Sequence, residues 1–178
     1  YDAGTTTQLM WGARSDVGCV RPHNEDSYLV QSPLFCVCDG MGGHAAGEVA
    51  SSIAVETIAK TAPQSADAAR LAAAVEAANA AVIEAALNGL GKPGMGCTAT
   101  CAYIENDTLA IAHVGDSRAY LLHEGTLIRV TRDHSYVEEL VDAGEITADE
   151  ARVHPARWAR IPPCMPTTLP CTSRKATA

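Results

Sequence analysis

An apolar run that ends in a glycine-rich turn decides the fold of this chain. Residues 34 to 51 run L-F-C-V-C-D-G-M-G-G-H-A-A-G-E-V-A-S. Leu34 to Cys38 is short, apolar and stops at an Asp-Gly pair, which favours a strand over a helix. From Gly47 to Thr61 the apolar positions recur at intervals of three and four, which predicts a helix. The segment therefore predicts a strand that delivers Asp39 into a turn, followed by a helix.

Outside this segment, predicted strands and helices fall into separate blocks. An alanine-rich helix is expected from Ser65 to Leu87, with Ser65 as its N-cap. Four β-type runs between Thr98 and Thr131 are joined by turns too short for crossover helices, which predicts an antiparallel meander. Thr147 and Glu150 have the spacing of a capping box, so a short helix is expected there. Strands grouped apart from helices indicate an α+β fold.

Composition divides the chain near residue 157. A chain of 178 residues is long enough for one domain with a sizeable core. Residues 157–178, however, contain four of the nine prolines, four basic residues and no acidic residue, and they show no hydrophobic period. We therefore expect one folded unit over residues 1–156 and a divergent, disordered tail over 157–178.

Charge and cysteine content exclude several classes of protein. The formal net charge of −8 argues against nucleic-acid binding, which normally uses a basic face. No apolar run approaches the ~18–20 residues that span a membrane, and no signal-peptide pattern opens the chain. The seven cysteines are odd in number and lack zinc-knuckle spacing, so free thiols and a reducing cytoplasm are expected.

Three acidic clusters, each at a strand end or in a turn, carry the candidate chemistry. Hard divalent cations such as Mg²⁺ and Mn²⁺ bind carboxylate and carbonyl oxygens, and an arginine suits phosphate oxygens. Each cluster taken singly is also explained by an ordinary turn or by an exposed side chain. The clusters contain Arg21, Glu25 and Asp26; Asp39 and Gly40; and Asp116.

Five motifs occur in a fixed order between residues 10 and 155. They run R-P-H-N-E-D-S, V-C-D-G-M-G-G-H-A-A-G-E-V-A-S, G-C-T-A-T, H-V-G-D-S-R-A-Y and T-R-D-H-S. In this order they closely resemble bacterial type 2C (PPM) Ser/Thr protein phosphatases. The resemblance implies an αββα sandwich of two antiparallel sheets flanked by helices. It also implies that residues 1–156 form the N-terminal part of the catalytic domain. The family's last two metal-binding aspartates would follow after the end of this sequence.

The same resemblance implies a role for each candidate position. Asp39 would bridge two metal ions, Mn²⁺ or Mg²⁺, and the Gly40 carbonyl would bind one of them. Asp26 would serve the second ion, with Glu25 beside it. Arg21 would hold the substrate phosphate. The metals would lower the pKa of a water molecule, so that hydroxide attacks phosphorus without a protein nucleophile.

Further positions are implied near the metal pair. Asp116 matches the position of a third, weaker metal ion in bacterial members, and residues 134–154 would form a flap that affects substrate access. Some members carry a histidine general acid directly after the Asp-Gly pair. Met41 stands at that place here, and His44 is merely nearby in sequence.

The implied function is metal-dependent hydrolysis of phosphoserine and phosphothreonine in cytoplasmic proteins, including a Ser/Thr kinase. Because the later aspartates are absent from these 178 residues, activity of this chain is expected to be impaired. The alternative is an inactive pseudophosphatase that binds phosphoproteins or a regulatory partner. A purely structural metal-binding module would leave the phosphate-binding arginine, Arg21, without a purpose.

Overall fold

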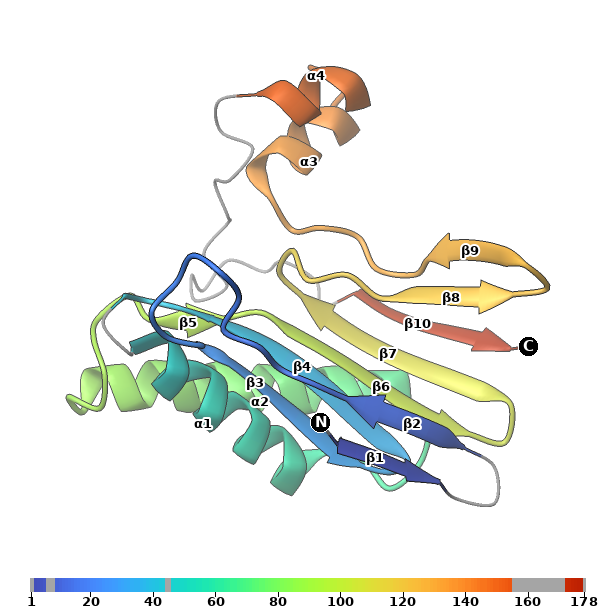
Figure 1. Cartoon of the computed structure of the whole chain (residues 1–178), viewed down its shortest axis with the longest axis horizontal. Helices are drawn as coiled ribbons and strands as arrows, with labels where there is room; N and C mark the ends of the chain where they lie inside the picture. The colour runs from blue at the N-terminus through green and yellow to red at the C-terminus, as the bar shows by residue number, and fades with distance from the viewer. Residues whose placement is uncertain (1, 6–8, 44–45, 155–171, 178) are drawn as a thin grey trace.

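The computed structural model of the chain describes residues 2–5, 9–43, 46–154 and 172–177. Within this part, six strands form one antiparallel sheet in the spatial order β10-β7-β6-β4-β3, and a short β5 extends the pairing at the end of β4 (Figure 1). The strands are β3 (Asp26–Gln31), β4 (Leu34–Met41), β5 (Gly96–Cys97), β6 (Ala99–Glu105), β7 (Thr108–Val114) and β10 (Thr172–Thr177).

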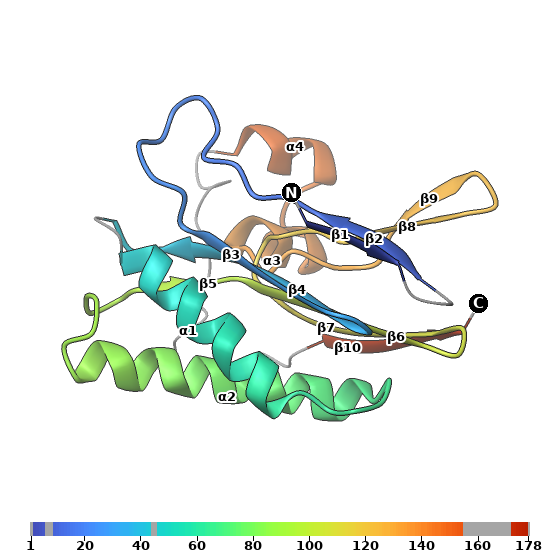
Figure 2. The same ribbon diagram turned by 60° about the horizontal axis from the view of Figure 1, so that its bottom comes forward.

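Two long helices, α1 (Ala46–Thr61) and α2 (Ala68–Leu87), cover one face of this sheet (Figure 2). Alternate residues of β4 point toward them, because successive side chains of a strand project to opposite faces. The core therefore forms where small side chains of the sheet meet helix residues, among them Cys36, Cys38, Ile58, Leu71 and Cys101.

The start of α2 differs from the sequence prediction. Its N-cap is Asp67, whose carboxylate accepts the backbone N–H groups of Ala69 and Arg70. Ser65 lies outside the helix and uses its backbone carbonyl to accept the N–H of Asp67. A carboxylate at this position also gains from the positive end of the helix dipole, which a serine hydroxyl does not.

A separate hairpin, β1 (Asp2–Thr5) with β2 (Met10–Ala13), lies over the sheet face opposite the helices (Figure 2). The Trp11 ring of β2 meets the Phe35 ring of β4 edge to face, with 6.1 Å between the ring centroids. This hairpin and the main sheet, with its helices, confirm the predicted α+β class. No helix in the described ranges has the length and the apolar content to cross a membrane.

The predicted meander between Thr98 and Thr131 is wrong as a single sheet. β6 pairs with β7, but β8 (Tyr120–His123) and β9 (Thr126–Arg129) form their own two-stranded sheet. The break comes at Gly115, whose φ of +107° is open to glycine but strained for other residues. The chain therefore leaves the main sheet at this turn and starts a projecting hairpin.

The C-terminal elements contain one confirmed prediction and one departure. Two short helices follow the hairpin, α3 (Tyr136–Asp142) and α4 (Ala148–Val153), and α4 begins with the predicted Thr147–Glu150 capping box. The sequence predicts disorder over 157–178, but the structure pairs β10 with the edge of β7. An edge strand offers unpaired backbone groups to any extended segment. Residues 155–171 lie outside the described residues.

Candidate metal and phosphate site

Antiparallel pairing places two predicted metal ligands side by side. Asp26 of β3 stands directly opposite Asp39 of β4 in the ladder. Directly opposed residues project to the same face, with Cβ atoms about 4.5–5.5 Å apart. Because Cys38 points into the core beneath the helices, Asp39 and Asp26 point to the other face. β4 extends to Met41, beyond its predicted end, because β3 and β5 pair with it on either side.

These carboxylates line a cavity of about 660 Å³ at the end of the sheet. All residues that the sequence predicts for phosphate binding and for the metal pair contribute to it. Asp116, predicted to bind a third metal ion, is not among its described lining residues. The lining consists of Asp16, Val17, Arg21, His23, Asn24, Glu25, Asp26, Asp39, Gly40 and Met41.

At Gly40, the end of β4 contacts both the residue before β3 and the first turn of α1. The Gly40 N–H donates to the Glu25 carbonyl over 3.2 Å. A Cβ at Gly40 would lie 2.1 Å from the Gly47 carbonyl oxygen, so this backbone contact excludes any larger residue. A Cβ at Gly47 would lie 2.5 Å from Glu25 Oε2. The Glu25 carboxylate therefore lies against the first turn of α1, where the helix dipole favours a negative charge.

Ser51 of α1 also holds the backbone of Glu25 in place, a role that the sequence analysis did not predict. Its side chain is fully buried, and its hydroxyl donates to the Glu25 carbonyl over 2.7 Å. The Ser27 hydroxyl lies 2.9 Å from it. The carbonyl of Glu25, the residue before Asp26, is thus held by both Ser51 and Gly40. A serine in mid-helix gives no sequence signal for this role.

The segment before β3 forms the outer wall of the cavity. Asn24 accepts the N–H of Asp26 over 3.0 Å and donates to Ser15 Oγ over 2.6 Å. The Asp16 carboxylate accepts one hydrogen bond from the Gly18 N–H and another from the Arg14 guanidinium, with which it also forms an ion pair. These two hydrogen bonds, first that of Gly18, hold the pKa of Asp16 below its ordinary value. Asn24 lies in the R-P-H-N-E-D-S motif, but the sequence analysis gave it no role.

The donor set fits a hard divalent cation. No three His, Cys, Asp or Glu side chains of the described residues converge to hold a metal ion by themselves. An ion here would rely on the carboxylates of Asp26 and Asp39, the Gly40 carbonyl and water. An all-oxygen set completed by water suits Mg²⁺ or Mn²⁺. His44, the histidine near the Asp-Gly pair in sequence, lies outside the described residues.

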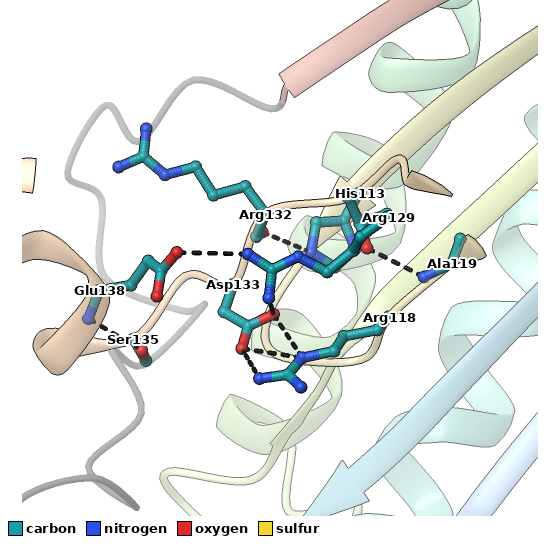
Figure 3. Close-up of polar contacts among 9 residues, drawn as sticks. His113, Arg118, Ala119, Arg129, Arg132, Asp133, Ser135 and Glu138 are labelled. Atoms are coloured by element: carbon teal, nitrogen blue, oxygen red, sulfur yellow. Dashed lines mark hydrogen bonds and ion pairs between the residues drawn. The ribbon is translucent and has the colours of Figure 1, made fainter. Parts of the chain in front are cut away.

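A second polar network anchors the segment that follows β9 (Figure 3). Arg118 binds the Asp133 carboxylate through two nitrogens, with Nη2 2.6 Å and Nε 3.1 Å from Oδ2. The Asp133 side chain is 9% exposed and that of Arg118 is 48% exposed. The hydrogen bond to Asp133 raises the pKa of Arg118 above its ordinary value.

His113, at the end of β7, joins this network from the sheet. Its side chain is buried, with Nδ1 2.9 Å from Thr100 Oγ1 and Nε2 2.9 Å from the Arg132 carbonyl. Because a carbonyl only accepts, Nε2 carries the proton and Nδ1 accepts from Thr100. Burial is the largest cause that lowers the pKa of His113, and the nearby His134 lowers it further. His113 thereby ties Arg132, just before the predicted flap, to the sheet.

Comparison with known proteins places this geometry in a family. The family described as Protein phosphatase 2C matches residues 12–140. The chain is 43% identical over 158 residues to the serine/threonine protein phosphatase PstP of Mycobacterium tuberculosis, covering 87% of this chain and 31% of PstP. It is 38% identical over 156 residues to the serine/threonine phosphatase stp of Listeria welshimeri, covering 81% of this chain and 62% of stp. The chain thus spans less than two thirds of these relatives.

Solved structures agree with the sequence comparison. The crystal structure of Mycobacterium tuberculosis PstP/Ppp superposes with a TM-score of 0.83 at 39% identity, covering 93% of this chain and 72% of that one. The catalytic domain of PstP in complex with two manganese ions superposes with a TM-score of 0.79 at 38% identity, covering 93% of this chain and 70% of that one. The chain described here belongs to the protein phosphatase 2C family.

Proposed function

We propose that this chain takes part in metal-dependent hydrolysis of phosphoserine and phosphothreonine in proteins. The observation that carries the proposal is the direct opposition of Asp26 and Asp39 in one cavity with Arg21. Two carboxylates on one face provide negative charge for cations, and the arginine provides positive charge for a phosphate. A phosphoryl-transfer site needs both.

In this proposal the acidic residues bind the metal ions and the arginine binds the phosphate. Asp26, Asp39 and the Gly40 carbonyl would hold two Mn²⁺ or Mg²⁺ ions, with Asp116 serving a third. When bound, such ions polarise a phosphoryl oxygen and lower the pKa of water. Arg21 binds two phosphate oxygens through its planar guanidinium and so orients the ester. The thioether of Met41 has no proton to give to the leaving oxygen.

Several finer features belong to the same proposal. The substrates are phosphorylated proteins, including a Ser/Thr kinase, and the protein acts in the cytoplasm. The β1–β2 hairpin is the beginning of the second sheet of an αββα sandwich. Support for this comes from its place over the face opposite the helices and from the Trp11–Phe35 contact.

The second candidate is a module that binds phosphoproteins without hydrolysing them. It is favoured by one observation, that no three metal-ligating side chains converge among the described residues. A site with a weakly held metal would still present Arg21 to a phosphate. The two functions therefore differ in turnover rather than in recognition.

Calorimetric titration of the 178-residue chain with Mn²⁺, beside hydrolysis of a phosphoserine peptide, separates the candidates. The variants are Asp39→Asn and, as a control, Asp107→Asn, an exposed aspartate in the β6–β7 turn. Turnover and Mn²⁺ binding that are both lost only in Asp39→Asn support the phosphatase. Binding of Mn²⁺ and peptide without turnover supports the binding module. A chain that binds no Mn²⁺ contradicts the metal site.

A further inference from the structure

Thr98 occupies an unusual position in the main sheet. Cys97 of β5 pairs with Gly40, and Thr100 of β6 pairs with Val37, so both strands follow one continuous register along β4. Thr98, between the two strands, therefore stands opposite Asp39. Its side chain is 3% exposed and is not among the described residues that line the cavity.

The hydrogen bonds between these two residues depart from a regular ladder. The N–H of Thr98 donates to the Asp39 carbonyl over 2.9 Å, as expected for a hydrogen-bonded antiparallel pair. In return, the N–H of Asp39 donates over 3.0 Å to Oγ1 of Thr98, the side-chain hydroxyl. A regular ladder would use the Thr98 carbonyl here. A side-chain oxygen thus sets the backbone position of Asp39.

The same hydroxyl reaches the turn that contains Asp116. Thr98 Oγ1 lies 2.7 Å from Ser117 Oγ. Because Oγ1 already accepts from Asp39, its own proton is available for Ser117. On the other side of Asp116, a Cβ at Gly115 would lie 2.6 Å from Thr98 Cγ2. Thr98 therefore contacts the residues on both sides of Asp116, one through its hydroxyl and one through its methyl group.

We propose that Thr98 is a positioning residue that fixes the Asp116 turn against the Asp39 strand. It sets the spacing between a metal ion held by the Asp26–Asp39 pair and one held at Asp116. The proposal rests on the proposed function, because both aspartates are metal ligands only there. Thr98 acts through the backbone of Asp39 and through Ser117, not by contact with an ion.

Three variants of the 178-residue chain test this role. Thr98→Val keeps the shape and removes the hydroxyl, and Thr98→Ser keeps the hydroxyl and removes the methyl group. Thr100→Val is the matched control, since Thr100 is a buried threonine two residues along the chain whose hydroxyl bonds His113 instead. Amide hydrogen exchange of the metal-free chain is measured first. Thr98→Val should speed exchange at the Asp39 amide roughly tenfold, and the other two variants should leave it within about threefold.

Mn²⁺ titration of the same variants gives the second measurement. Thr98→Val should weaken Mn²⁺ binding roughly tenfold, with Thr98→Ser and Thr100→Val within about threefold of the unmodified chain. The proposal is overturned if Thr98→Val shows the same amide exchange or the same Mn²⁺ affinity as the unmodified chain. It is also overturned if Thr100→Val shows the same changes as Thr98→Val in both measurements. If the unmodified chain binds no Mn²⁺, the proposed function fails. The exchange data then still decide whether Thr98 holds the Asp39 strand.

Discussion

At the first turn of α1, glycine is needed for space rather than for an unusual backbone conformation. Gly47 is helical and buried, and a Cβ there would lie 2.5 Å from Glu25 Oε2 and 2.8 Å from the Gly40 carbonyl carbon. The missing side chain lets the helix approach β4 closely enough to hold Glu25. Because Gly47 has a hydrogen atom in place of a side chain, the helix can lie this close to the candidate metal site.

Gly47→Ala tests this steric role. Helix propensity alone would stabilise the variant by about 1 kcal/mol. Overpacking against Glu25 and Gly40 costs about 1–3 kcal/mol, so we expect a net loss of up to about 2 kcal/mol in the free energy of unfolding. Urea denaturation measures it. Glu56→Ala, at an exposed position of the same helix, should change stability by less than about 0.5 kcal/mol. A more stable Gly47→Ala chain would contradict the close contact.

Sequence reasoning predicted charged residues that line one cavity in the structure, and it missed the neutral residues that hold them in place. Asp26 and Asp39 belong to distinctive motifs and were predicted to lie together. Thr98 and Ser51 are buried hydroxyls, and similar residues occur throughout ordinary strands and helices. Their partners lie far away in sequence and become visible only when the strand register is known. The roles of Arg21 and Asp116 in binding stay predictions.

At the scale of elements, an ion pair closes the base of the β8–β9 hairpin. The hairpin makes no ladder with the main sheet within the described residues. Arg118, just before β8, and Asp133, after β9, close the hairpin with three hydrogen bonds. The ladder of β8 and β9 is four residues long, which by itself is marginal in water. We therefore expect the ion pair to contribute to the stability of the hairpin, together with the hydrogen bonds that join Ala119 to Val130 and Thr131.

Asp133→Asn should loosen the hairpin. Loss of the charge leaves Arg118 poorly paired, and because that arginine is 48% exposed we expect a loss of only about 1–3 kcal/mol. Limited proteolysis should then cut within residues 120–129 much sooner, and urea unfolding gives the global change. Asp149→Asn removes a carboxylate from an exposed ion pair with Arg152 and serves as the control. Equal protease sensitivity of both variants would rule out the proposed closure.

Stability should also fall in mild acid because of two histidines. Burial is the first cause that lowers the pKa of both His113 and His134 below 6.5. The unfolded chain therefore binds more protons than the folded chain below that pH, and stability declines as the pH falls through it. Urea midpoints at about pH 7 and about pH 5.5 check this. His113→Gln should reduce the difference, whereas His123→Gln, at an exposed position, should leave it intact. A pH-independent midpoint would refute the assignment.

The ends of the helices and strands show where the local sequence pattern is sufficient to predict an element. Hydrophobic period predicted α1 to within one residue, because its apolar face is a local property. The Asp-Gly pair predicted the end of β4 too early, because cross-strand pairing by β3 and β5 overrides the turn preference at Asp39. Likewise, nothing local distinguishes a strand of the main sheet from one of the separate β8–β9 hairpin.

At the scale of the whole molecule, a group of cysteines lies in the core between the sheet and the helices. Cys36 and Cys101 are directly opposed on β4 and β6, with 2.9 Å between their sulfur atoms, and Cys38 follows on the same face of β4. The hydrogen bond with Cys101, together with burial, raises the pKa of Cys36 well above its ordinary value. Thiols held protonated and covered by helices react slowly.

Thiol labelling therefore reports on global unfolding. In a Cys164→Ser/Cys171→Ser background, exposed Cys19 should react with an aromatic disulfide reagent at once. Cys36, Cys38 and Cys101 should react only at the rate of global opening, and the rate should rise steeply with urea. Absorbance of the released thiolate follows both phases. Rapid reaction of every cysteine in native buffer would show that the helices do not cover this core.

The α+β class was predictable because strands and helices fall into separate blocks along the chain. The family was predictable because its five motifs occur in a fixed order. The αββα arrangement of layers was implied only by the family resemblance. Local patterns do not give it, because it depends on contacts such as Trp11 with Phe35 between separate segments. The tail shows the same limit. Its composition suggested disorder, and the edge of β7 pairs with Thr172–Thr177 nonetheless.

The alternation along β4 has a consequence for how the chain avoids folding errors. Core thiols and the Asp39 carboxylate occupy adjacent positions on opposite faces of this strand. A slip of one residue against β3 would exchange the faces, so that Asp39 entered the apolar layer beneath α1 and α2. An unpaired carboxylate there is costly enough to make the misaligned sheet far less stable than the native one. Asp39, which we propose to hold metal, thus also disfavours the wrong alignment of the central strand.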